Sequence, residues 1–293
     1  MDKSSLESFI AIAEKKSFSR AAEKLHITQP AISKRLASLE LQLNAQLIDR
    51  IGKTARLTHS GEVLYHHAKQ LLEAMETCKT EINNLNEAVT GTLSIALSHH
   101  IAQYRIPVPL KIFANKFAQV KLSPSFVDSS SAFDMIKSGE VEIALATLQP
   151  KKPDNIIQTP IWRDPLCFVV GAQHSLTRKN ADKPLSLQEL CEFTALLPKS
   201  LEQTRENLNR LLIQAKSKPI HTIEANSLDN IKMMTKIGLG WTLLPRTMID
   251  NELKGLVMNI ENPKRQLGLI HLEHRTLSNA AKAFIQILRQ YSG

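Results

Sequence analysis

Two short helical runs separated by four residues constrain this chain more than any other feature. They lie in "SFSRAAEKLHITQPAISKRLASLE", residues 17–40. Thr28 is a suitable N-cap for the second run, and Pro30 falls in its first turn, where a missing N–H costs nothing. The apolar residues of that run share one helical face and comprise Ile32, Leu36, Leu39 and Leu43.

The first run has its own start signal. Ser17 or Ser19 can cap a short helix in which Ala21 and Ala22 allow close packing against a neighbour. The connection at 26–29 has the length expected of a helix-turn-helix, whose second helix enters the major groove by its N-terminal end. A plain helical hairpin with a solvated polar face is the alternative.

The stretch "LIDRIGKTARLT", residues 47–58, predicts two short strands around Gly52. Such a wing can reach phosphates or the adjacent minor groove, and Gln29 on the second helix can pair with adenine. We therefore expect a double-stranded DNA partner. The candidate DNA-binding residues are Ser19, Arg20, Thr28, Gln29, Pro30, Ser33, Lys34, Arg35, Arg50, Lys53 and Arg56.

A long apolar seam follows the wing. Between Glu62 and Thr90 there is no proline or glycine, and apolar residues recur in steps of four and three. This a/d pattern predicts a dimerising helix that ends at Thr90-Gly91, although a helix packed on its own domain fits the same period. The seam residues are Leu64, Ala68, Leu71, Met75, Cys78, Ile82, Leu85 and Val89.

Beyond Gly91 the pattern alternates between strands and helices, which favours an α/β fold with mostly parallel sheets. About 200 residues suffice for two small α/β lobes, and we expect the chain to cross between them at 149–155. Predicted strands are 92–97, 120–127, 141–147, 166–171, 194–198, 221–225, 241–245 and 267–272, and predicted helices include 201–216, 227–237 and 276–290.

Composition narrows the class of protein. The formal net charge of +9 is compatible with an anionic partner. Cys78, Cys167 and Cys191 are widely spaced and form no disulfide or metal framework. The polar start "MDKSSLESF" is no signal peptide, and no apolar run is long enough to span a bilayer. We expect a cytoplasmic protein with no membrane association, metal or cofactor.

The segment at 9–40, "FIAIAEKKSFSRAAEKLHITQPAISKRLASLE", together with "RLTHSG" ending at Gly61, resembles the LysR-type transcriptional regulators. Asn44 replaces the family's usual glycine, which is tolerable because asparagine accepts left-handed backbone, and Ile48 replaces a usual phenylalanine. The resemblance implies an inducible DNA-binding regulator, typically a homotetramer assembled from homodimers. RNA polymerase stays open as a further partner.

The resemblance extends over the whole chain in the order of its parts. It implies an all-α winged helix-turn-helix at 1–58, a linker helix at 59–90 and an effector-binding domain at 91–293 that resembles periplasmic binding proteins. We call residues 91–162 with 268–293 lobe 1, and residues 163–267 lobe 2.

Ligands of two-lobed α/β proteins bind between the lobes at the carboxyl ends of strands. Ser98, His99 and His100 follow the first strand of this region, and adjacent histidines on a helix point in different directions, so we expect at most one of them in the cleft. By analogy with the family, the cleft also draws on Ser129, Thr147, Ser200 and Asn226. Hydroxyl and imidazole groups suit a small anion or carboxylate as effector.

Three other functions fit the sequence less well. The chain has no GxSxG, HExxH, P-loop or complete GxGxxG motif, so nothing nominates an enzyme. A free-standing solute-binding protein leaves residues 1–90 unexplained. An architectural DNA-binding protein without an effector leaves about 200 residues without a role.

Overall fold

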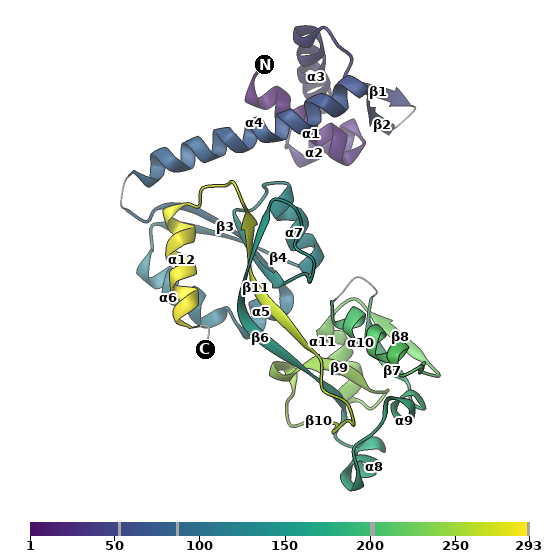
Figure 1. Cartoon of the computed structure of the whole chain (residues 1–293). Coiled ribbons are helices and arrows are strands. Elements are labelled where there is room, and N and C mark those ends of the chain that lie inside the picture. Colours follow the sequence, from purple (N-terminus) through teal and green to yellow (C-terminus); the bar gives the residue numbers. More distant parts are fainter. Residues whose placement is uncertain (52–53, 86–87, 200–202, 292–293) are drawn as a thin grey trace. The chain divides into compact units, whose positions relative to one another are not determined.

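The computed structural model describes residues 1–51, 54–85, 88–199 and 203–291 and divides the chain into two compact units, Met1–Asn86 and Glu87–Gly293. Within those ranges no helix is both long and apolar enough to cross a membrane. The elements of the first unit (Figure 1) are α1 (Lys3–Lys15), α2 (Phe18–Lys24), α3 (Gln29–Leu43), β1 (Ile48–Ile51), β2 (Thr54–Leu57) and α4 (His59–Asn84).

The predicted helix-turn-helix is confirmed, including the N-cap residues of both helices. The Ser17 hydroxyl accepts from the Arg20 N–H, and the Thr28 hydroxyl accepts from the Ala31 N–H, each at 3.4 Å. Asn44 ends α3 in the left-handed region with φ 46°, as expected of a residue that replaces glycine there. The apolar face of α3 packs into a core with α1, α2 and the start of α4, built around Phe9, Ile12, Ala21, Ile32 and Leu39. Leu43, predicted on that face, is 40% exposed because it occupies the last turn, beyond the core.

Helix α4 differs from the predicted seam at both ends. Ala68 is buried in the core of its own unit and Leu64 packs against it, so the first seam positions are occupied within the chain. The helix ends at Asn84 rather than at Thr90, after two asparagines whose short side chains compete with the helical backbone for hydrogen bonds. Val89 packs instead on the core of the second unit.

Gly61 explains how α4 can start so close to the wing. A Cβ at this position would lie 2.1 Å from the Leu47 carbonyl oxygen, which also accepts from the Thr58 N–H. We expect Gly61→Ala to destabilise the first unit by about 1–3 kcal/mol through overpacking against the backbone. Faster hydrogen exchange in peptides from residues 1–86 would report this loss. Gly255→Ala, whose Cβ would meet nothing within 4 Å, is the control and should leave exchange unchanged.

The second unit contains lobes 1 and 2. Its strands are β3 (Gly91–Ser98), β4 (Val120–Val127), β5 (Ile143–Thr147), β6 (Ile156–Gly171), β7 (Ala195–Pro198), β8 (Thr222–Ala225), β9 (Thr242–Pro245), β10 (Leu253–Gly255) and β11 (Lys264–Leu272). Its helices are α5 (His99–Tyr104), α6 (Pro107–Lys116), α7 (Ser129–Lys137), α8 (Leu176–Asp182), α9 (Leu187–Cys191), α10 (Gln203–Gln214), α11 (Leu228–Lys236), η1 (Arg246–Met248) and α12 (Asn279–Gln290).

The main sheet is mixed, which corrects the prediction of mostly parallel sheets. Its strand order is β10-β6-β11-β5-β3-β4, with β9 also paired to β6. Strands β3, β4 and β5 are parallel, whereas β11 is antiparallel to both β5 and β6. The antiparallel strands arise because the chain returns to lobe 1 through β11 after completing lobe 2.

Two long antiparallel strands connect the lobes. Strands β6 and β11 run side by side from lobe 1 into lobe 2 (Figure 1), and their register shifts between Leu267 and Gly268. The predicted crossing at 149–155 is wrong, because this loop joins β5 to β6, and both strands pair with β11 in lobe 1. The predicted strands 166–171 and 267–272 are therefore only the ends of these longer strands.

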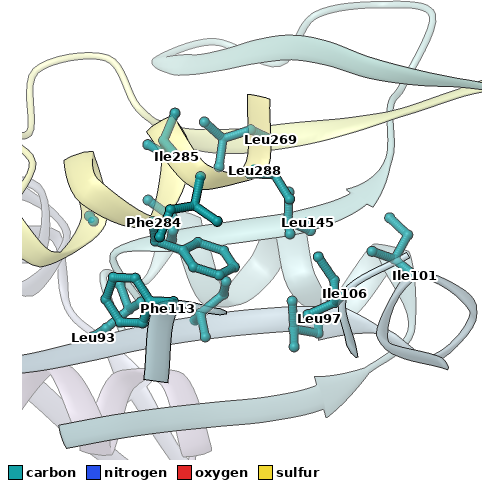
Figure 2. Packing of buried hydrophobic residues seen from close by; sticks show 14 of the residues in the cluster. Leu93, Leu97, Ile101, Ile106, Phe113, Leu145, Leu269, Phe284, Ile285 and Leu288 are labelled. Atoms are coloured by element: carbon teal, nitrogen blue, oxygen red, sulfur yellow. The ribbon is translucent and has the colours of Figure 1, made fainter. Parts of the chain in front are cut away.

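Helices cover both faces of the lobe 1 sheet. On one face α6 and α12 pack through Phe113 and Phe284, whose ring centroids are 5.4 Å apart at 90° (Figure 2). On the other face α7 contributes Phe133 and Ile136 to a second buried cluster. Lobe 2 has its own core around Trp241. The carboxyl ends of β3 and β5, at Ser98 and Thr147, lie toward lobe 2.

Candidate functional site

The predicted DNA-binding residues gather on α2, α3 and the wing. Ser33 and Arg35 are half-buried, and Lys53 lies outside the described residues. Within the described ranges, no carboxylate oxygen lies within 4.0 Å of the Arg20 or Lys34 side-chain nitrogens, so these charges are available to phosphate. The exposed members are Ser19, Arg20, Thr28, Gln29, Pro30, Lys34, Arg50 and Arg56.

The leading end of α3 is preorganised by α2. The Ser19 hydroxyl donates to Gln29 Oε1 at 3.1 Å across the turn between the helices. This contact holds the Gln29 amide at the exposed first position of α3 and leaves its NH₂ donors for a base edge. Such a fixed side chain loses less conformational freedom when it binds a base.

Arg50 connects the wing to α2. Its guanidinium carbon lies 4.2 Å from the centre of the Phe18 ring. A guanidinium stacked on an aromatic ring keeps its N–H donors directed outward in its own plane, which suits bidentate binding of a phosphate. Arg56 on β2 pairs in register with Asp49 on β1, beside Arg50.

The second candidate site is a cavity between the two lobes of the second unit. A cavity of about 420 Å³ contains six of the seven predicted effector-binding residues, and Ser200 lies outside the described residues. Both histidines contribute, which corrects the expectation of one: His100 is buried, whereas the His99 side chain is 60% exposed at the rim. The six residues are Ser98, His99, His100, Ser129, Thr147 and Asn226.

The floor of this cavity holds a buried ion pair that the sequence did not reveal. Arg265 on β11 donates from Nε to Asp164 Oδ2 on β6 at 2.6 Å and from Nη1 to the Thr204 hydroxyl at 3.0 Å. Arg105 Nη2 lies 3.7 Å from Asp164 Oδ1, too far for a hydrogen bond. Asp164 is completely buried, and within the described residues its Oδ1 has no hydrogen-bond partner.

His100 of lobe 1 contacts both this cluster and Thr247 of lobe 2. Arg265 Nη2 lies 3.3 Å from His100 Nδ1, and His100 Nε2 lies 2.9 Å from the Thr247 hydroxyl. Because arginine can only donate, Nδ1 must accept, so the ring proton sits on Nε2 and donates to Thr247. Burial, together with the charges of Arg265 and Arg105, lowers the pKa of His100 to about 3. The imidazole is therefore neutral at physiological pH.

This pKa predicts an acid-dependent loss of stability. Below the unfolded pKa of about 6.5 the unfolded chain gains a proton that folded His100 refuses, so stability falls as the pH drops from about 6.5 toward 3, by at most about 1.4 kcal/mol per pH unit. His100→Gln should flatten this dependence, measured by urea unfolding followed through Trp162 and Trp241. His99→Gln, at the exposed rim, is the control. An unchanged slope in His100→Gln would contradict the assignment.

Arg265 was missed because its position depends on strand pairing. The predicted strand began at Leu267 and left Arg265 in a loop, whereas in the structure Arg265 pairs in register with Asp164. Lys199 and Arg105, near the candidate residues in sequence, do not line the cavity. Among the described residues, no group of three or more His, Cys, Asp or Glu side chains could hold a metal ion.

Comparison with known proteins agrees with this architecture. Residues 86–293 match the model of the LysR substrate binding domain, and residues 4–62 match that of the bacterial regulatory helix-turn-helix proteins of the lysR family. The chain belongs to the LysR family. Relatives that match nearly the whole chain are transcriptional regulators. This LysR protein consists of a helix-turn-helix domain and a substrate-binding domain.

Two of the relatives that match nearly the whole LysR chain illustrate the similarity. The transcriptional regulator CysL of Bacillus subtilis is 27% identical over 97% of this chain and 95% of its own length. A probable RuBisCO transcriptional regulator of Chlorokybus atmophyticus is 30% identical, covering 94% and 90%.

Solved structures of full-length relatives share the fold. OxyR of Pseudomonas aeruginosa matches with a TM-score of 0.71 at 21% identity, covering all of this chain and 94% of that one. CbnR in complex with its target DNA matches with a TM-score of 0.61 at 20% identity, covering both chains completely.

Proposed function

We propose that this LysR regulator binds an inverted-repeat operator through residues 18–58, and that a small anion or carboxylate in the cavity between the lobes modulates operator binding or promoter activity. The observation that carries the proposal is the cavity itself, which gathers hydroxyl and imidazole groups from strand ends of lobe 1 opposite Asn226 of lobe 2. Its volume is in the range of small-molecule sites.

The linker helix α4 supplies the pairing of two such heads. Leu71, Met75, Ile82 and Leu85 are between 43% and 82% exposed along one side of the helix, and Cys78 lies among them. An apolar stripe of this length is unusual in contact with water. We infer that two copies bury it against each other in a homodimer, and that dimers associate further into a homotetramer.

Ligand binding can reach the DNA through movement of the lobes. Contacts of His100 with Thr247 and with Arg265 connect lobe 1 to lobe 2. A ligand that touches both lobes favours their closed arrangement, and this provides the differential affinity that regulation requires. An architectural DNA-binding protein would lack this response.

Ser98→Ala tests the effector site. Ser98 is 6% exposed and makes no side-chain cap to α5, so loss of its hydroxyl should cost the fold little. We expect the variant to lose about tenfold in effector affinity, as for one strong hydrogen bond, and to keep its operator affinity. Isothermal titration calorimetry measures effector binding, and a mobility-shift assay measures operator binding. Ser123→Ala, exposed on β4, is the control; an unaltered effector response in Ser98→Ala would move the site elsewhere.

A further inference from the structure

The cavity between the lobes is polarised from floor to rim. On its floor Arg265 and His100 are 7% and 9% exposed. Arg265 and Arg105 place two positive charges around the single carboxylate of Asp164, and His100 is neutral. The two guanidinium groups exceed this one carboxylate by one positive charge. Arg105 is 21% exposed and does not line the cavity, so a bound anion would be stabilised chiefly by Arg265.

Two hydroxyl side chains line the same floor. Ser98 and Thr147 are 6% and 7% exposed and line the cavity. Within the part of the chain that the structure describes, neither the Ser98 Oγ nor the Thr147 Oγ1 makes a hydrogen bond, although the Thr147 N–H donates to Ser129 Oγ at 3.2 Å. Of the described residues, the fully buried side-chain atoms without a partner are Arg105 Nε and Asp164 Oδ1. The Ser98 and Thr147 hydroxyls are therefore open to the cavity, where a ligand oxygen can bond to them.

The rim carries the opposite charge. Three exposed carboxylates line it: Asp128 from lobe 1, and Glu206 and Asp229 from lobe 2. Lys151 is the lysine among the lining residues and leaves the rim with a net negative charge. Asp128 precedes α7 without capping it through its side chain, and its carboxylate lies 3.9 Å from His99 Nε2.

A simple carboxylate or inorganic anion satisfies the floor but is repelled by the rim. A ligand that carries an ammonium group as well satisfies both. We propose that the effector is a small amino acid, whose carboxylate binds Ser98, Thr147 and Arg265 on the floor and whose ammonium group binds Asp128 and Asp229 at the rim. This inference rests on the proposed function, because it takes the cavity as the effector site.

Asp128 and Asp229 belong to different lobes and line the same cavity, so an ammonium group bound to both would lie between their carboxylates. It neutralises their mutual repulsion when the lobes approach. The amino group then adds to what favours the closed arrangement, because a carboxylate without it leaves the two rim carboxylates repelling each other as the lobes approach.

The test titrates the full chain with each probe by isothermal titration calorimetry. The probes are L-α-amino acids and the ω-amino acids from glycine to 5-aminopentanoate, each beside the carboxylic acid that lacks the amine, with sulfate and phosphate as simple anions. We expect an amino acid to bind at least about tenfold more tightly than its amine-free partner, since a charge-assisted contact is worth about that much.

The double substitution Asp128→Asn with Asp229→Asn should abolish this preference, weakening the amino acid and strengthening the amine-free acid. Asp134→Asn, exposed on α7 outside the cavity lining, is the matched control and should change neither. Equal binding of paired acids, binding of simple anions alone, or an unchanged preference in the double variant would each overturn the amino-acid assignment.

Operator binding separates this inference from the proposed function. If an amine-free acid or simple anion changes operator affinity and no amino acid does, the proposed regulatory function is supported and the amino-acid class of the effector is wrong. If the preferred amino acid binds with the expected sensitivity to Asp128 and Asp229 but leaves operator binding and promoter activity unchanged, the ligand class stands and the proposed function falls.

Discussion

Replacing Lys34 and Arg50 together by alanine should lower operator affinity about 10- to 100-fold and reduce the slope of log affinity against log salt by about 2. Both side chains are exposed, Lys34 on α3 and Arg50 on the wing. Each neutralises a phosphate in the proposed complex and releases a counterion on binding. Fluorescence anisotropy of a labelled duplex, titrated at several salt concentrations, measures both quantities.

A second double variant tests whether loss of net charge alone lowers operator affinity. Lys254→Ala with Lys282→Ala removes the same two charges from exposed positions of the unit formed by the two lobes. This control should keep its operator affinity within about twofold, because charges away from the duplex are screened. An equal loss in both double variants, or an unchanged salt slope in the first, would contradict the placement of the DNA-binding face.

Replacing Met75 and Ile82 together by glutamate should produce the second large effect. These residues are 48% and 60% exposed in the chain and lie in the stripe that we propose to be buried between paired α4 helices. Four carboxylates would then meet in the paired seam, which should dissociate the dimer. Operator affinity should fall about 100-fold or more, because linkage of two heads raises avidity by about that factor.

Analytical ultracentrifugation and a mobility-shift assay measure the two parts of this prediction on the same preparation. Gln70→Glu, exposed on α4 away from the stripe, adds negative charge to the same helix and should leave the dimer intact. If the Met75/Ile82 variant sediments like the unmodified chain, the stripe does not pair the protein.

The sequence predicted best those elements whose signals are local. Thr28, Pro30 and Asn44 mark the two ends of α3 through capping and backbone preference, and the structure has α3 at Gln29–Leu43. The wing was equally readable, because two short strands flank one glycine. Its hydrogen bonds to α3, from the Leu47 and Ile48 N–H groups to Glu40 Oε1, were not.

Long-range pairing set the limit. The order of strands and helices in the sequence does not predict that β11 lies antiparallel between β5 and β6. This pairing places Arg265 beside Asp164 and His100. The predicted seam was wrong at its first positions for a related reason, because a helical period does not show which surface the apolar residues contact. Leu64 and Ala68 fit the same period as Met75, although they pack within their own unit.

The candidate residues of the cavity were accessible from sequence to the extent that strand ends define them. Ser98, Ser129 and Thr147 each stand at the end of a lobe 1 strand or at the start of the helix that follows. No comparable sequence pattern predicts the rim carboxylates Glu206 and Asp229. They line the cavity because lobe 2 packs against the connecting strands β6 and β11.

Selection of duplexes from a random pool by the purified full-length chain tests the account most directly, since it asks at once whether the N-terminal unit reads sequence and whether it does so in pairs. The account predicts enrichment of inverted repeats whose two half-sites have a fixed spacing. Enrichment of isolated half-sites, or of no sequence at all at low salt, would contradict it.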